Sequence, residues 1–278
     1  MPRAANTAVE FAEQVLGPGI VVTGRCQQAG TVVQGRDARG SEYVLKQHGS
    51  ETKHAREVRA YQQWAPALGQ RTAQLVASSS QAMTIIITAL PGDAEHSASD
   101  TADVHRQAGA LLRAFHGAAE PRALPGYRGW LTDRAHYWAR NAGELLSGHD
   151  LMLVRTHLDA LAAYDIPQGN PCHLDFQPRN WLVDQAGIVR LGDFEHARFD
   201  LPARDLVRLY FRVWPTRPDL RAAFLSGYGR DLTSTEQEMI RHLGALDALT
   251  ALGRGNQNRD PSLILRGQAT IRTLRELA

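Results

Sequence analysis

The sequence predicts an α+β fold of two lobes, a small β-rich lobe followed by a larger, mainly helical one. Residues 20–90 contain short β-rich runs separated by glycine-containing turns. After residue 100 the apolar residues follow a helical period over long spans. The 278 residues, 43% hydrophobic and 22% charged, suffice for one large domain or two lobes. We place the N-terminal lobe at residues 1–91 and the C-terminal lobe at 92–278.

The predicted N-terminal lobe is an antiparallel sheet with one helix. The runs 20–25, 31–36 and 42–48 are typical of three strands in a meander. The stretch 51–68 predicts one helix, because its apolar side chains share a face. Two more strands follow, in 74–79 and 82–90, and the second has the length of a buried strand.

The predicted C-terminal lobe is helical apart from one hairpin. Its strands are NWLVD (180–184) and IVRLGDF (188–194), joined by a Gln-Ala-Gly turn. Seven helices are expected, at 101–117, 130–147, 150–163, 203–213, 217–228, 234–252 and 261–277.

Composition excludes several classes of protein. The N-terminus lacks an apolar signal region, and no apolar run approaches membrane-spanning length, so we expect no membrane association. Two cysteines, Cys26 and Cys172, suggest no disulfide framework and a cytoplasmic location. The net charge is +2, and the basic residues are scattered without interleaved aromatic residues. A nucleic-acid groove is therefore not expected.

Four polar residues surround the predicted hairpin. The stretch HLDFQPRN contains His173, Asp175 and Asn180; Asn180 comes directly before WLVD of the first strand, and Asp193 directly after IVRLG of the second. The hairpin would bring its open ends together, so Asn180 and Asp193 would lie side by side. Amide and carboxylate oxygens suit Mg²⁺. Asp175, in the loop just before, would be free to meet an incoming hydroxyl. This arrangement indicates phosphoryl transfer.

The spacing of these residues resembles a known family. HLDFQPRN followed by GDFE resembles the catalytic and metal-binding loops of protein-kinase-like enzymes, and among them the aminoglycoside phosphotransferase family. The resemblance implies a bilobal protein-kinase-like fold that uses ATP and Mg²⁺, with ATP or GTP preference left open. It also implies Asp175 as the catalytic carboxylate and Asn180 and Asp193 as metal ligands. Asp205 follows Asp193 by twelve positions, which leaves no room for a peptide-docking activation segment.

The same resemblance implies a nucleotide site in the N-terminal lobe. Lys46, in YVLK, matches the strand lysine that contacts the α and β phosphates, and Glu57 matches the helix residue that holds this lysine. The backbone of Thr88 and Leu90 would bind the adenine. The loop RCQQAGTVVQG lacks the pattern G-x-G-x-x-G, so it offers no evident phosphate cradle.

Three further residues receive roles from the resemblance. His173 is expected to orient or pack, and Asp205 to tie the catalytic loop to the following helix. Gln177 and Arg179 stand where the family often has His and Gly. Arg179 is a candidate for contact with substrate or phosphate.

The expected function is transfer of the γ-phosphoryl group of ATP to a hydroxyl of a small molecule, an antibiotic in the first instance. Residues 205–278 contain eight Asp or Glu against eleven Arg, which favours a nucleoside, peptide or macrolide over a polycationic aminoglycoside. The alternatives are a metabolic kinase of the same fold, acting on choline, homoserine or a sugar, and a non-catalytic nucleotide-binding pseudokinase. Monomer and homodimer both remain open.

Overall fold

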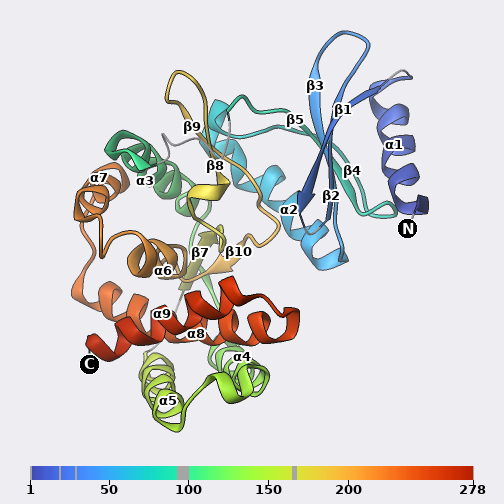
Figure 1. The fold of residues 1–278 in the computed structure, drawn as a ribbon. Coiled ribbons are helices and arrows are strands. Elements are labelled where there is room, and N and C mark those ends of the chain that lie inside the picture. Colours follow the sequence, from blue (N-terminus) through green and yellow to red (C-terminus); the bar gives the residue numbers. More distant parts are fainter. Residues whose placement is uncertain (1, 19, 29, 93–99, 165–167, 278) are drawn as a thin grey trace.

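The computed structural model describes residues 2–18, 20–28, 30–92, 100–164 and 168–277. Five strands and two helices gather at one end of the chain, and the remaining helices form a larger body beside them (Figure 1). The α+β prediction of a small sheet-containing lobe and a larger helical lobe is confirmed. The boundary between residues 91 and 92 stays a prediction, and residues 93–99 of the expected turn-rich break lie outside the described residues.

The N-terminal lobe is built on a five-stranded antiparallel sheet in the order β1-β2-β3-β5-β4. The strands are β1 Val21–Gln28, β2 Gly30–Arg36, β3 Glu42–Gln47, β4 Leu75–Ser79 and β5 Thr84–Thr88. Lys46 lies in the middle strand, paired with Val32 of β2 and Ile85 of β5. The meander sequence of β1 to β3 was predicted correctly.

The centre of strand β5, Ile85–Ile87, is apolar because a helix covers each face of the sheet. Ile86 packs with Ala12 of α1 (Pro2–Leu16), whereas Ile85 and Ile87 face the core that contains Tyr61 of α2 (Glu51–Gln63). Burial of alternate side chains on both faces favours a continuous apolar run. The sequence reading did not predict α1.

Helix α2 is shorter than predicted. The Ser50 hydroxyl caps its first turn by accepting the Lys53 N–H at 3.3 Å. The helix ends at Gln63, and a 3₁₀ segment, Ala65–Arg71, replaces the expected continuation to residue 68. Pro66 lacks an amide hydrogen and disfavours helical backbone in the residue before it, so the α-helix stops here.

The C-terminal lobe contains all seven predicted helices. They are α3 Ala102–His116, α4 Tyr127–Ala142, α5 Gly148–Ala163, α6 Ala203–Arg212, α7 Pro218–Tyr228, α8 Ser234–Asn258 and α9 Pro261–Glu276. Helix α8 is the centre of this lobe, since α4, α5, α6 and α9 all pack against it (Figure 1). Helices α3 and α7 approach so closely that a Cβ on Gly227 would clash with the Arg106 carbonyl. None of the described helices combines the length and the apolar character needed to cross a membrane.

Five short strands of the C-terminal lobe, in a hairpin and a small sheet, support the polar residues of the predicted site. The predicted hairpin is β8 Trp181–Val183 with β9 Val189–Leu191. A small sheet that the sequence did not predict, in the order β10-β7-β6, lies beneath it. Its strands are β6 Arg122–Ala123, β7 Gln168–Cys172 and β10 Arg198–Asp200. Strand β7 leads directly into the loop that carries Asp175.

Gly92, in the chain segment that follows β5, packs closely against the β8–β9 hairpin. Its φ is 112°, and a Cβ there would lie 2.7 Å from the carbonyl carbon of Val183. Only glycine permits this backbone conformation and this approach. Arg190 of β9 adds a side-chain link, since it donates to the Pro91 carbonyl at 3.3 Å. The hairpin is therefore attached to the chain segment that leaves the sheet.

Candidate active site

The β8–β9 hairpin brings the separated parts of the polar motif together. Trp181 pairs with Leu191, and the Gly192 N–H donates to the Asn180 carbonyl at 3.4 Å. Asn180 and Asp193 therefore flank the open end of the hairpin, where the sequence placed them. Asp193 has a left-handed backbone, with φ of 64°.

Two side chains hold the backbone of the loop that carries Asp175. The Asp205 carboxylate of α6 accepts the N–H of His173 at 2.8 Å and the N–H of Leu174 at 2.5 Å. Leu174 has a φ of 63°, so this carboxylate stabilises a strained turn. The His173 ring contacts the Gly192 carbonyl at 3.0 Å and thus connects the loop to the residue before Asp193.

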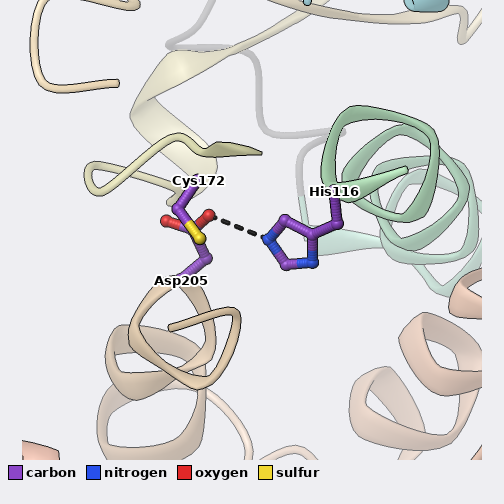
Figure 2. A group of neighbouring side chains, drawn as sticks. All are labelled: His116, Cys172 and Asp205. Atoms are coloured by element: carbon purple, nitrogen blue, oxygen red, sulfur yellow. Dashed lines mark hydrogen bonds and ion pairs between the residues drawn. The ribbon is translucent and has the colours of Figure 1, made fainter. Parts of the chain in front are cut away.

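His116, Cys172 and Asp205 form a compact buried group behind this loop (Figure 2). The His116 Nε2 lies 3.0 Å from an Asp205 oxygen, and the Cys172 thiol donates to the Asp200 carbonyl at 3.2 Å. Burial raises the pKa of the Cys172 thiol well above its usual value. A thiol binds metals as the thiolate, and both Asp205 oxygens already accept hydrogen bonds. We interpret the group as a structural tie.

Asp175 is buried and surrounded by hydrogen-bond donors. Its carboxylate accepts from Gln177 and Arg179, both at 2.8 Å, and from Asn180 at 2.9 Å. Arg208 of α6 forms an ion pair with it. Burial acts to raise the pKa of the Asp175 carboxyl, but Arg208 and then Arg179 outweigh it and hold this pKa well below its usual range. Asp175 is therefore ionised at neutral pH.

Lys46 lies among three carboxylates. Its Nζ is 2.5 Å from Asp193, 2.9 Å from Glu57 and 3.4 Å from Glu195. Burial acts to lower the pKa of the lysine, and these carboxylates together raise it above its usual value. Glu57 also accepts the Phe194 N–H at 3.2 Å and contacts His48 at 2.5 Å. The predicted lysine–glutamate pair is present, and its role toward nucleotide stays a prediction.

Asn180 and Asp193 fit the hard-oxygen ligation assigned to Mg²⁺. The Asn180 Nδ2 donates to both the backbone carbonyl and the carboxylate of Asp175, at 2.7 and 2.9 Å, so its amide oxygen is left for a cation. Burial acts to raise the pKa of Asp193, and Lys46 lowers it below its usual value. An ionised carboxylate and an amide oxygen, with phosphate and water, suit Mg²⁺.

The connection after β5 offers backbone groups at the expected hinge. The Thr88 N–H is already used, since it donates to the Gln74 carbonyl at 3.0 Å. Of the two predicted groups, the Thr88 carbonyl and the Leu90 N–H are those that suit an adenine edge. Both residues are half-buried.

A pocket of about 190 Å³ lies beside Asp175, between the catalytic loop and helices α4, α6, α8 and α9. Asp175, Gln177 and Arg179 line it, but Lys46 and Asp193 do not. His196 also lines it, and burial lowers the pKa of this histidine to about 4, so it is neutral at pH 7. Asp175 therefore borders two regions, the lysine cluster on one side and this pocket on the other.

Comparison with known proteins identifies the family. The model of the phosphotransferase enzyme family matches residues 28–239, about three quarters of the chain. The chain belongs to the phosphotransferase enzyme family. No curated protein matches the sequence.

Solved structures of phosphotransferases share this fold at low sequence identity. A choline kinase from Streptococcus pneumoniae is 16% identical, covers 99% of each chain and has a TM-score of 0.70. A macrolide 2′-phosphotransferase from Brachybacterium faecium is also 16% identical, covers 96% of this chain and 97% of its own, and has a TM-score of 0.67. A spectinomycin phosphotransferase solved with ADP and spectinomycin is 14% identical, covers 98% and 93%, and has a TM-score of 0.62. At these identities the likeness establishes the protein-kinase-like fold.

Sequence reasoning assigned no role to three residues of this candidate site. Arg208, which pairs with Asp175, follows Asp205 by one helical turn, and this spacing is a signal that both side chains face the loop. Glu195 contacts both Lys46 and Lys53, at 3.4 and 2.8 Å. These are the two lysines of the sequence, so their rarity was the available signal for a shared site.

Proposed function

We propose that this protein is an ATP-dependent O-phosphotransferase that transfers the γ-phosphoryl group to a hydroxyl of a small molecule. The observation that carries the proposal is the position of Asp175. Its buried, ionised carboxylate lies between the cluster of Lys46 and Asp193 and a pocket that neither of them lines. An acceptor hydroxyl in the pocket could reach this carboxylate while the nucleotide lies on Lys46 and Asp193.

In the proposed reaction Asp175 orients the acceptor hydroxyl and receives its proton. The acceptor oxygen forms a bond to the γ-phosphorus, the bond from that phosphorus to the ADP oxygen breaks, and the proton moves to the Asp175 carboxylate. The low pKa of Asp175 makes it a weak base, which suits a loose transition state in which the proton leaves late. Asn180 holds the carboxylate in place through its amide hydrogens.

The nucleotide would lie over the lysine cluster. Lys46, positioned by Glu57, would contact the α and β phosphates, while the Thr88 carbonyl and the Leu90 N–H would bind the adenine edge. Mg²⁺, held by Asn180 and Asp193, would neutralise charge on the phosphates. The solved spectinomycin phosphotransferase complex with ADP supports nucleotide use in this fold.

For the acceptor we propose an antibiotic, and among antibiotics a nucleoside, peptide or macrolide rather than a polycationic aminoglycoside. Eight arginines line the pocket with three aspartates. A polycation would be repelled by this lining. The macrolide and spectinomycin phosphotransferases of the same fold support a small-molecule acceptor.

Two alternatives remain distinct from an antibiotic kinase. A metabolic small-molecule kinase would use the same residues on a cellular alcohol, and the choline kinase of the same fold supports it. A pseudokinase would bind nucleotide without transfer. The placement of Lys46, Asp175 and Asp193 around one site argues against the second alternative.

A screen for ADP release with mass spectrometry of the acceptor tests the proposal. The protein would be incubated with ATP and Mg²⁺ and with antibiotics, choline, homoserine and sugars in separate reactions. We expect one class to gain a single phosphoryl group, at a hydroxyl. Nucleotide binding without ADP release for any acceptor would favour the pseudokinase, and turnover confined to metabolic alcohols would replace the antibiotic assignment.

A further inference from the structure

The pocket beside Asp175 contains an excess of arginine over carboxylate. Its eight arginines come from the catalytic loop, β10 and helices α4, α6, α8 and α9. The three aspartates of the lining include Asp175 itself and Asp205, whose oxygens are taken by the backbone N–H groups of the loop. Asp247 is the third. The lining is therefore strongly basic.

Four of these arginines share carboxylates in pairs. Arg198 and Arg204 both contact Asp200, at 2.7 and 2.6 Å. Arg212 lies 2.6 Å from Asp247, and Arg208 divides its contacts between Asp247 at 3.9 Å and Asp175. Asp200 faces two guanidinium groups, and Asp175 and Asp247 together face those of Arg179, Arg208 and Arg212, so each group of side chains keeps an excess of one positive charge.

Three other arginines have no carboxylate partner. Arg134 of α4, Arg254 of α8 and Arg266 of α9 all line the pocket, and none of them forms an ion pair with a described residue. The pKa of Arg134 is lowered to about 10, first by burial and then by Arg204 and other arginines nearby. The Arg134 Nε is buried without a hydrogen-bond partner among the described residues.

Aromatic rings hold two of these guanidinium groups without neutralising them. Arg134 lies over Trp130 and Trp138 at 5.5 and 5.7 Å from the ring centroids, and Arg254 lies over Trp138 at 5.7 Å. Stacking on an aromatic face restricts a guanidinium and leaves its N–H donors and its charge available. These arginines are therefore ordered before any ligand binds.

We propose that the acceptor of this phosphotransferase is an anion, with a phosphate or carboxylate group in addition to the hydroxyl that is phosphorylated. Arg134, Arg254 and Arg266 would bind the acid group, because the planar guanidinium matches both oxyanions with two parallel hydrogen bonds. Asp175 lines the same pocket, so the hydroxyl of a compact acceptor would reach it while the acid group lies on these arginines. This inference rests on the proposed phosphotransferase activity and narrows its acceptor to an acidic compound, which among the antibiotic classes proposed above fits a peptide with a free carboxylate and not an uncharged nucleoside or a macrolide.

Binding of simple ions tests the pocket without knowledge of the acceptor. The protein saturated with ADP and Mg²⁺ would be titrated calorimetrically with inorganic phosphate, with citrate and with spermidine, and the heats of the same injections into ADP and Mg²⁺ without protein, which include chelation of Mg²⁺ by citrate, would be subtracted. We expect phosphate and citrate to bind in a salt-sensitive manner and spermidine not to bind. Tighter binding of phosphate would indicate a phosphorylated acceptor, and tighter binding of citrate a carboxylic acid. Binding of spermidine, or binding of neither anion, would overturn the proposal.

Matched arginine variants decide where the anion binds. Arg254 and Arg266 are exposed, so the double variant Arg254→Gln/Arg266→Gln is expected to fold. We expect it to weaken anion binding by about tenfold or more, the typical effect of losing charge-assisted contacts. The control is Arg272→Gln, an exposed arginine of the same helix α9 outside this pocket, which should leave binding unchanged. The proposal would be overturned if the double variant and Arg272→Gln weakened anion binding equally. It would also be overturned if anion binding disappeared once ADP is present, because the anion would then occupy the nucleotide site.

Turnover separates this inference from the proposed function. Glucose, glucose 6-phosphate, glucuronate and glucosamine offer hydroxyls on one ring with neutral, phosphate, carboxylate and ammonium character. If phosphoryl transfer is faster to glucose or glucosamine than to the acidic sugars, and the double variant does not change this, the anionic acceptor is refuted. The proposed kinase activity then still stands. If the anions bind and this binding depends on the arginines, but no acceptor in any screen is phosphorylated, the proposed kinase activity is refuted. The proposed anion site then still stands.

Discussion

On one side of Asp175, Lys46 and Lys53 meet three carboxylates, whereas on its other side eight arginines line a pocket with three aspartates. The first region has more negative than positive side chains and suits a divalent cation with its phosphates. The second has an excess of positive charge and suits an anion. Asp175 lies where the two regions meet. The contrast teaches that one carboxylate can join an acidic region, proposed here for the nucleotide and Mg²⁺, to a basic region proposed for the acceptor.

The largest effect is expected from Asp175, because both regions depend on it. Asp175→Ala should reduce kcat by roughly 10²–10⁴-fold, the usual contribution of a positioned acid–base group. Nucleotide affinity should change little, since the lysine cluster remains. Both quantities would be measured, by ADP release and by calorimetric titration with ADP. Asp133→Asn, an exposed aspartate of α4, is the control. A variant that loses nucleotide binding instead would show that Asp175 belongs to the first region alone.

The next effect tests the acidic region through its metal requirement. Asp193→Asn removes one charged ligand, and we expect the Mg²⁺ concentration for half-maximal ADP release to rise by about tenfold or more. Asp184→Asn changes an aspartate at the turn end of the same hairpin, where it pairs with Arg190, and should leave the requirement unaltered. An unchanged Mg²⁺ requirement in Asp193→Asn would contradict the assignment of Asp193 as a metal ligand. The acidic region would then not be a Mg²⁺ site that depends on this carboxylate.

Arg208 couples the two regions, since it contacts Asp175 and Asp247. Its positive charge is the main influence that lowers the pKa of the Asp175 carboxyl, so Arg208→Gln should raise this pKa. Because Asp175 acts when ionised, the variant should lose more of its kcat/KM between pH 7 and pH 5 than the wild type does. Arg208→Lys should restore part of the profile. A loss of activity that is equal at every pH would assign Arg208 a purely structural role.

The same shift has a consequence for stability. The pKa of Asp175 is lowered in the folded state, so its stabilising contribution is present above its ordinary pKa near 3.8 and is lost as the pH falls below that value. Arg208→Gln should remove part of this contribution at neutral pH. Urea unfolding of the variant and of Arg155→Gln, an exposed arginine of α5, would measure the difference. Identical unfolding free energies would show that the ion pair contributes nothing to stability.

The sequence could specify the acidic region far better than the basic one. Asn180 and Asp193 lie at fixed distances along the chain from a hairpin, so local pairing is enough to bring them together. Lys46 and Glu57 could be identified only through resemblance, because a sheet and a helix place them. Arg134, Arg254 and Arg266 come from three helices that meet only when α8 packs against α4 and α9. The excess of arginine over acidic residues in 205–278 has the same sign as the charge of the pocket lining, but of the eight arginines in that lining the sequence analysis singled out only Arg179, which lies outside this range.

The smallest effect is expected from His196, and it bears on the source of the positive charge. Burial lowers the pKa of this histidine to about 4, so the arginines alone should provide the charge of the pocket at neutral pH. The affinity for sulfate, whose own charge does not change between pH 6 and pH 8, should therefore change less than about twofold over this range, in the wild type and in His196→Gln. The unfolded state takes up a proton near pH 6.5 and the folded state only near pH 4, so the wild type should lose stability as the pH falls between these values. His196→Gln should escape this loss, and its unfolding free energy relative to the wild type should rise from pH 7 to pH 5. Sulfate binding that strengthens on acidification in the wild type alone would show that His196 carries part of the charge and that arginine is not the only source of charge in the basic region.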